Sequence, residues 1–496
     1  MTRILVALLL MIPLFAFPAP SVSNKVLRVG VNAYPANLNP VYTTDETSQA
    51  VVNKIFDALF EFNSQGALVN RLVKSFSYTS DTDINLKLKK GIRFSNGNEL
   101  TAADVEATVR LLMNENVQYP YASNLAFISS FKAVGKYSLR LRTKSPAAAW
   151  RNFLTFKILC AQEIKSIETS DLSAFRIKQL SGTGPYMLGA VDPPNTVSLK
   201  RNPYSQANSL YPVLQYAVVA YPHLVPLKLL NREIDLCELQ PEDIPVYRKK
   251  KNWQDSFRIL KYNKFGYTYL VFNLQNPDIT LELRQLLYNA LVAGTFTGKY
   301  LQGRGQAVKS PFMLLSEEVE ANSFAIDRIS PPKRLKMLTN SESQMRKRFI
   351  LFLKKELLPL GIELEPVFVE YHSFLDNLKR KDFDLALSGF LLDIDYDMRD
   401  ILASKSYFNY AGYSSQEMDR LLDAGLRELD SGKRKTVYLE AHGIWKKDLP
   451  LLPLFNLYYF VGVANNVPIP EDTCRLMGSS GDFLQNIRCW KTATKD

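Results

Sequence analysis

Segments with the pattern of β-strands alternate with helical segments along almost the whole chain, and this alternation constrains the fold most. Apolar patterning predicts strands at residues 26–31, 267–273, 362–369 and 383–392, and a final strand or strand pair at 451–463. Apolar residues at helical spacing predict helices at 345–358, 417–429 and 436–449. This alternation is typical of α/β lobes, so we predict an α/β fold. A chain of 496 residues that is 46% hydrophobic is globular, with material for roughly three structural units.

The first 23 residues have the features of a secretory signal peptide. Arg3 gives a basic start, residues 4–17 are apolar and interrupted by Pro13, and small residues follow at 19–23. The apolar run is too short to span a bilayer. No cysteine follows it before Cys160, so a lipid anchor at the cleavage site has no attachment residue. We expect a soluble mature protein outside the cytoplasm.

The chain is basic, with a formal net charge of +12 that falls by one when the signal peptide removes Arg3. Its Lys and Arg residues are scattered, with only short clusters at 248–251 and 346–348. Scattered positive charge indicates a basic, soluble surface rather than a face for nucleic acid or an anionic membrane.

Four cysteines occur in a chain that we expect to be exported, where disulfides persist. Cys474 and Cys489 close a short C-terminal loop, and we predict that they are bridged, which stabilises by ~3 kcal/mol in the chain-entropy model. Cys160 and Cys237 lie in apolar surroundings and are either two buried thiols or a second bridge.

Four aspartates follow the predicted strand at 383–392, namely Asp393, Asp395, Asp397 and Asp400. A calcium loop needs Gly at its sixth position and an acid at its twelfth, and counting from Asp393 these positions hold Met398 and Ser404, which disfavours calcium.

Three further interpretations of this acidic run stay open. The first is magnesium-dependent phosphoryl transfer at Asp393 and Asp395, in which one carboxylate is the nucleophile and the other holds the metal, although Asp397 stands where that chemistry expects a hydroxyl residue. The second is a partly buried carboxylate that pairs with a ligand ammonium group. The third is a solvated acidic loop without function.

A series of short motifs follows in order along the mature chain. They are LNP (38–40), FDALFEFN (56–63), LKLKKGIRFSNGNELTAADVEATVRLL (86–112), GTGPYML (182–188) with KRNPY (200–204), REID (232–235), FN (272–273) with LRQLLYNAL (283–291), and DFDLALSGF (382–390). This order resembles the peptide/nickel class of extracellular solute-binding proteins, the receptors of ABC importers for oligopeptides and dipeptides.

The resemblance implies a two-lobed periplasmic-binding-protein clamp with an extra αβ domain inserted in the first lobe. The implied division is a signal peptide at 1–23, lobe I at 24–60, 176–270 and 456–496, the inserted domain at 61–175 and lobe II at 271–455. Hinge strands are expected near residues 270 and 455.

The resemblance also implies a set of ligand-binding residues. They are Glu46 and Thr47 for backbone contacts from the first lobe, Gly389, Phe390 and Leu391 at a strand end, and Asp393 as the acid that holds the ligand's ammonium group. Phe390 stands where the family usually has Trp, and is either a core aromatic or a pocket residue. The spacing of the acids also allows Asp395 to take the role of Asp393.

The function that this resemblance implies is capture of a small peptide and its delivery to an inner-membrane ABC permease. The protein is then a periplasmic monomer with no cofactor, no catalysis and no nucleic-acid partner. The same fold also serves receptors for nickel, haem or sugars, and His223, His372 and His442 have no ligand spacing that selects a metal. No nucleophile elbow supports a hydrolase.

Overall fold

The computed structural model describes residues 26–35, 37–63, 66–165, 180–207, 211–241, 244–293, 295–326, 334–392, 394–469, 476–477, 483–484 and 487. The predicted signal peptide, Asp393 and the predicted Cys474–Cys489 bridge lie outside these residues. Within them, no helix is long and apolar enough to cross a membrane.

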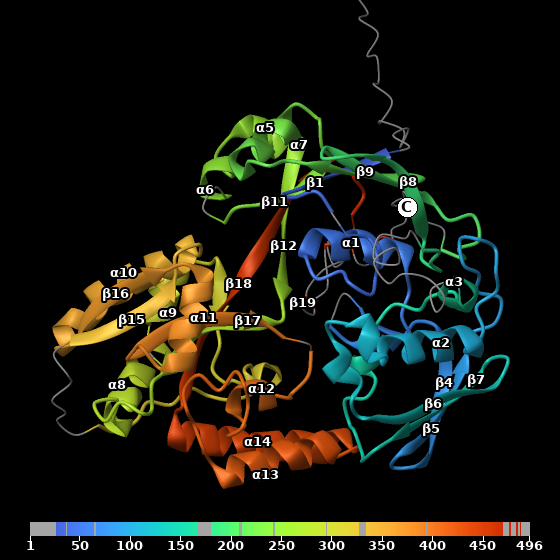
Figure 1. The fold of residues 1–496 in the computed structure, drawn as a ribbon. Helices are drawn as coiled ribbons and strands as arrows, with labels where there is room; N and C mark the ends of the chain where they lie inside the picture. The colour runs from blue at the N-terminus through green and yellow to red at the C-terminus, as the bar shows by residue number, and fades with distance from the viewer. Residues whose placement is uncertain are drawn as a thin grey trace, which may run out of the picture.

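A thirteen-stranded sheet runs through the molecule, and one part of it forms lobe I (Figure 1). In this lobe β1 pairs in parallel with β10 and β11, and β9 and β8 continue antiparallel to the sheet edge. The strands are β1 (Val26–Val31), β8 (Tyr186–Asp192), β9 (Thr196–Arg201), β10 (Val213–Val218), β11 (Leu236–Leu239), β12 (Phe257–Lys264) and the short β19 (Leu476–Met477). The helices are α1 (Glu46–Ile55), α5 (Val225–Leu230), α6 (Ile244–Tyr247) and α7 (Lys251–Ser256).

The other part of the sheet forms lobe II, on the left of Figure 1. Its strands are β13 (Gly266–Phe272), β14 (Gly305–Ala307), β15 (Arg334–Asn340), β16 (Glu363–Val369) and β17 (Leu385–Leu391). Its helices are α8 (Leu281–Leu291), α9 (Phe296–Leu301), α10 (Gln344–Leu357), α11 (Tyr371–Arg380), α12 (Arg399–Leu402), α13 (Gln416–Arg427) and α14 (Ser431–Asp448). Every residue of β13 is buried, as its aromatic and β-branched sequence predicts for a central strand.

The inserted domain is a four-stranded antiparallel sheet covered by a helix. Its strands are β4 (Val73–Ser80), β5 (Asp83–Leu88), β6 (Ile128–Gly135) and β7 (Ser138–Thr143), and its helices are α2 (Ala102–Leu112) and α3 (Ala161–Lys165). Thr101 and Asp104 form a capping box at the start of α2. A two-stranded sheet of β2 (Phe60–Phe62) and β3 (Leu68–Asn70) precedes this domain. Short 3-10 helices occupy Glu115–Val117, Ala122–Leu125, Asn152–Leu154, Pro222–Leu224, Met313–Leu315 and Leu358–Leu360.

Two chain segments connect the lobes. β18 (Leu451–Ala464) pairs with β13 through its first residues and with β11 and β12 through its last, and β12 and β18 run side by side between the lobes in Figure 1. β12 leads directly into β13. The predicted final strand or strand pair is therefore one long strand, and the buried apolar residues form two clusters, one for lobe I with the inserted domain and one for lobe II.

Two expectations are refined by the structure. The helix predicted at 436–449 begins earlier, at Ser431, because Asp430 caps it by accepting a hydrogen bond from the Lys433 N–H at 2.9 Å. Cys160 and Cys237 are free and buried, so they are two thiols and not a second bridge.

Candidate functional site

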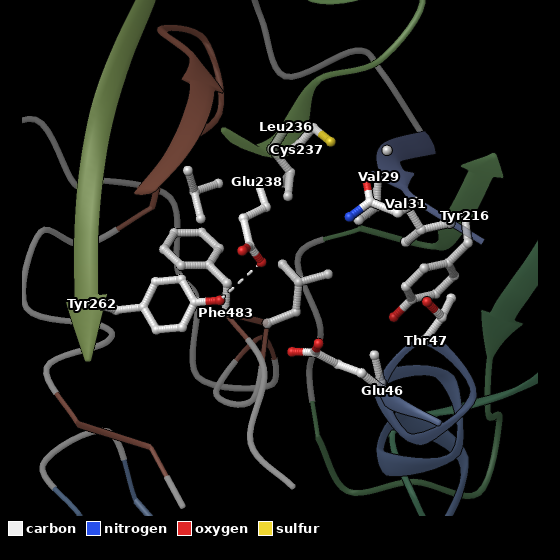
Figure 2. A pocket seen from close by; sticks show the side chains of 15 residues that line it. Val29, Val31, Glu46, Thr47, Tyr216, Leu236, Cys237, Glu238, Tyr262 and Phe483 are labelled. Carbon is white, nitrogen blue, oxygen red and sulfur yellow. Dashed lines mark hydrogen bonds between the residues drawn. The ribbon is translucent and has the colours of Figure 1, made fainter. Parts of the chain in front are cut away.

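Glu46 and Thr47 lie in the first turn of α1 and line a pocket of about 120 Å³, called here the lobe I pocket (Figure 2). Asp45 fixes the start of this helix, since its carboxylate accepts a hydrogen bond from the Ser48 N–H at 2.8 Å. The exposed Glu46 carboxylate contacts the buried ammonium group of Lys264. The pocket is also lined by the end of β1 and by side chains of β10, β11 and β12.

Glu238 supplies a second carboxylate to the lobe I pocket, from β11. The Tyr262 hydroxyl donates a hydrogen bond to Glu238 Oε2 at 3.3 Å, drawn as a dashed line in Figure 2. Burial raises the pKa of Glu238 to about 7, because this hydrogen bond offsets the loss of hydration only in part. In Figure 2 the carboxylates of Glu46 and Glu238 both point toward the middle of the pocket.

Gly389, Phe390 and Leu391 lie at the end of β17 and line a cavity of about 750 Å³, called here the lobe II cavity. The Phe390 ring packs against Tyr267 and Tyr269, with ring centroids 5.0 and 4.8 Å apart, and is half-buried. Phe390 is therefore both a packed aromatic and a cavity wall. Further walls come from α10, α11 and the segment after α12, including Tyr371, Phe374, Tyr407, Phe408 and Tyr410.

One edge of β17 is open where it borders this cavity. On one side β17 pairs with β13 along its whole length, from Leu385 to Leu391. On the other side its ladder with β15 covers only Leu385 and Ala386. Among the described residues, the segment from Ser388 to Leu391 therefore has no strand partner on its cavity side, and its backbone is available to an added strand.

Two more cavities border the spaces already described. A hinge cavity of about 400 Å³ shares Glu238 with the lobe I pocket and Glu342 and Ser343 with the lobe II cavity. An inter-lobe cavity of about 430 Å³ shares Leu391 with the lobe II cavity and is otherwise lined from the loop before α1, from α1 and from the inserted domain. The four spaces thus form a series in which each shares at least one lining residue with the next, and this series is called the cleft here.

The described aspartates of the acidic run have different partners. Arg434 binds Asp395 through two parallel hydrogen bonds of 2.9 and 2.5 Å, and Asn152 of the inserted domain donates to the same carboxylate at 3.2 Å. Asp397 pairs with Arg399 at 2.7 Å. Asp400 lines the lobe II cavity, where burial and the nearby Asp397 raise its pKa.

The described residues contain no cluster of side chains suited to a metal ion. No group of three or more His, Cys, Asp or Glu side chains among them is arranged to hold a metal ion.

Glu238 and Arg346 are among the charged residues of the cleft that were not found from the sequence. Arg346 lies in the first turn of α10 and lines the lobe II cavity. A cation in the first turn opposes the helix dipole, and this is the one sequence signal that marks it as unusual. Glu238 lies in an ordinary short strand and carries no such signal.

Two lobes built on one sheet, connected by crossing strands and lined by this series of cavities, define a two-lobed clamp of the periplasmic-binding-protein type. The chain belongs to the bacterial extracellular solute-binding proteins of family 5, whose middle-region sequence model matches residues 67–316.

Known proteins of this kind are similar over nearly the whole chain. The oligopeptide-binding protein AppA of Bacillus subtilis (strain 168) is 22% identical over 503 residues, covering 94% of this chain and 91% of that protein. The nickel-binding protein NikA of Staphylococcus aureus (strain NCTC 8325 / PS 47) is 22% identical over 448 residues, covering 86% and 87%. The crystal structure of the ABC transporter substrate-binding protein CtaP from Listeria monocytogenes has a TM-score of 0.79 at 21% identity, covering 92% and 98%. The predicted two-lobed clamp is thus confirmed.

Proposed function

We propose that this protein captures a peptide between its two lobes and delivers it to an inner-membrane ABC permease. The observation that carries the proposal is the open edge of β17 from Ser388 to Leu391, which borders the lobe II cavity of about 750 Å³. An extended peptide adds to such an edge as a further strand, so backbone hydrogen bonds supply affinity without selecting a sequence. The name of the relative AppA, an oligopeptide-binding protein, supports the same ligand class.

Within this proposal the sequence-predicted residues keep their roles. Asp393 holds the ligand's ammonium group, Gly389, Phe390 and Leu391 form the strand edge, and Glu46 and Thr47 contact the ligand from lobe I. The lobes divide at 24–60, 176–270 and 456–496 for lobe I, 61–175 for the inserted domain and 271–455 for lobe II. The protein acts as a periplasmic monomer after removal of residues 1–23, without a cofactor, covalent chemistry or nucleic acid.

The ammonium anchor is tested with calorimetry on penta-alanine and N-acetyl penta-alanine, after mass spectrometry of the molecules retained on the purified protein. Asp393→Asn removes only the charge and leaves a buried cation unpaired, which costs ~2–5 kcal/mol. We expect a roughly thirty- to several-thousandfold loss of affinity for the free peptide. Acetylation should reproduce this loss on the wild type.

Asp395→Asn is the matched variant. Since its carboxylate already pairs with Arg434, we expect it to lower the melting temperature more than the affinity. Equal binding of free and acetylated peptide to the wild type would overturn the anchor. Absence of any bound peptide, together with tight binding of Ni²⁺, would overturn the peptide function in favour of the ligand named for NikA.

A further inference from the structure

Arg346 is a cation that lines the lobe II cavity and has no counter-ion among the described residues. Its Nη1 donates to Asn340 Oδ1 at 3.0 Å, while its Nε is buried and has no hydrogen-bond partner among the described residues. The charged or titratable groups that act on it are Tyr269 and Tyr371, and no carboxylate of the described residues forms an ion pair with it.

The tyrosines do not neutralise this guanidinium. A tyrosine is uncharged at neutral pH, and burial raises the pKa of Tyr269 further. Burial also lowers the pKa of Arg346, which shows that the charged form is poorly solvated where it lies. A half-buried cation at the start of a helix, without a counter-ion among the described residues, is unfavourable on two counts, through desolvation and through the helix dipole.

The acids of the same cavity are engaged elsewhere or lie away from Arg346. Glu342 accepts a hydrogen bond from Asn340 Nδ2 at 3.0 Å and one from the Tyr371 N–H at 3.2 Å. Asp400 lies on another wall and is not among the groups that act on Arg346. The other cation of the cavity, Lys379, lies 5.0 Å from the centroid of the Tyr407 ring.

The guanidinium lies over one face of β17 at Gly389, within the segment whose edge is open. A methyl group at Gly389 would come within 2.7 Å of Arg346 Nη2, so only Gly leaves room for it there. A ligand that adds to this edge therefore passes beside a planar donor with an unused N–H. Carboxylate is the group that matches this donor geometry, because guanidinium binds it through two parallel hydrogen bonds.

We propose that Arg346 binds a carboxylate group of the ligand in the lobe II cavity, so that the protein selects peptides with an acidic group at this position. The inference rests on the proposed peptide function and specifies its substrate class. The carboxylate is either an Asp or Glu side chain or the peptide C-terminus. Both sources offer the same chemistry, and the experiment separates them.

The probes are penta-alanine peptides that carry one glutamate at each position in turn, the same set with glutamine, and penta-alanine amidated at its C-terminus. Calorimetry measures each against the wild type and Arg346→Met. If the carboxylate is a side chain, one glutamate peptide should bind the wild type at least about thirtyfold more tightly than the matching glutamine peptide. If it is the C-terminus, penta-alanine with a free C-terminus should bind at least about thirtyfold more tightly than amidated penta-alanine. On Arg346→Met the acidic and neutral members of that pair should bind alike.

Three further variants separate recognition from folding. Arg346→Lys keeps the charge without the planar fork, and should restore part of the preference. Gly389→Ala displaces the guanidinium without removing it, and should also reduce the preference. Lys347→Met removes a charge from the next position of α10, outside the lobe II cavity, and should leave the preference unchanged.

The outcomes distinguish this inference from the peptide function. If neutral peptides bind the wild type as well as acidic ones at every position and terminus, the carboxylate site is wrong and the peptide function stands. Equal weakening of acidic and neutral peptides by Arg346→Met assigns Arg346 a structural role and also overturns the site. If no peptide binds, mass spectrometry of retained molecules decides: an acidic non-peptide that Arg346→Met loses supports the site alone, and a neutral molecule or none overturns both.

Discussion

The carboxyl of Glu238 makes the stability of lobe I depend on pH. Its neighbours in the cleft are Glu46 from α1, Tyr262 from β12 and Tyr459 from β18, with Lys264 over the Tyr459 ring at 4.7 Å. Burial raises the pKa of Glu238 from 4.5 to about 7. Below pH 4.5 the group is protonated in both the folded and the unfolded chain, so it costs no stability there.

As the pH rises from 4.5 to 7, the unfolded chain ionises Glu238 first and the folded state loses stability relative to it. The loss is up to roughly 3 kcal/mol above pH 7. We predict that Glu238→Gln removes this loss, so the free energy of unfolding of the variant increases relative to that of the wild type as the pH rises. Urea unfolding of both proteins between pH 4.5 and 8.5 measures the difference. Parallel pH profiles, or the same gain in the exposed control Glu320→Gln, would contradict the assignment.

Residues of the cleft differ in how far the sequence predicts them. An apolar run that ends in acids is a local pattern, and it correctly places Gly389, Phe390 and Leu391 at a strand end that lines a cavity. Whether a charged side chain is buried depends on packing between distant segments, so Arg346 was not predicted. The pairing of Asp395 with Arg434 is likewise invisible to spacing, although it decides which acid of the run remains available.

At the scale of elements, the connection between β12 and β13 is fixed by one glycine. Gly266 has φ of +153°, and a Cβ there would lie 2.2 Å from Phe390 O and 2.8 Å from Leu391 Cα. Asn456 of β18 stabilises the connection between β12 and β13, since its Nδ2 donates hydrogen bonds to Lys264 O at 2.7 Å and to Gly266 O. The hinge therefore touches the end of β17, where the ligand is proposed to bind.

We predict that Gly266→Ala destabilises the protein by roughly 1–3 kcal/mol, because backbone atoms cannot yield to the new methyl group. The variant should also weaken peptide binding, since the added methyl group displaces the backbone at the end of β17. Gly303→Ala, with φ of +79° and no atom within 4 Å, isolates the dihedral cost, and Gly298→Ala in α9 has neither problem. Thermal unfolding gives the melting temperature of each variant, which should be lowest for Gly266→Ala and highest for Gly298→Ala. Equal melting temperatures for Gly266→Ala and Gly298→Ala would refute the clash.

Most elements follow from local patterns, while their connections do not. Helical spacing predicts α10 and α13 within one or two residues. α14 begins earlier than predicted because its Asp430 cap outweighs the unfavourable Gly432 in its first turn. The sequence of β18 predicts a strand, but its pairing with both lobes is set by partners far away in the chain.

At the scale of the whole molecule, the inserted domain touches lobe II across the cleft. The Ala148 N–H donates to Leu426 O at 2.7 Å, and Asn152 Nδ2 donates to Asp395 at 3.2 Å, with Arg434 holding Asp395 in place. In Figure 1 the helices α13 and α14 lie beside the inserted domain at the bottom of the molecule. These contacts exist only while the two bodies are close, so they favour the closed arrangement.

We predict that Asn152→Ala shifts the clamp toward an open state. A hydrogen bond to a charged group contributes ~1.5–3 kcal/mol. The apparent affinity of a ligand that binds the closed state falls in proportion to the population of that state. Small-angle scattering should show a larger radius of gyration for the ligand-free variant than for the wild type. Saturating peptide should compact both proteins to the same value, with affinity for the variant weakened by roughly tenfold.

Asn85→Ala is the matched control, because Asn85 is exposed on β5 of the same domain and bonds only to Thr79 in the described structure. It should scatter and bind like the wild type. If Asn152→Ala leaves the ligand-free radius of gyration unchanged while peptide still compacts the protein, the contact is incidental and closure depends on the ligand alone. If saturating peptide leaves the radius of the wild type unchanged, the lobes do not close on a ligand, and the clamp mechanism fails whatever the variants do.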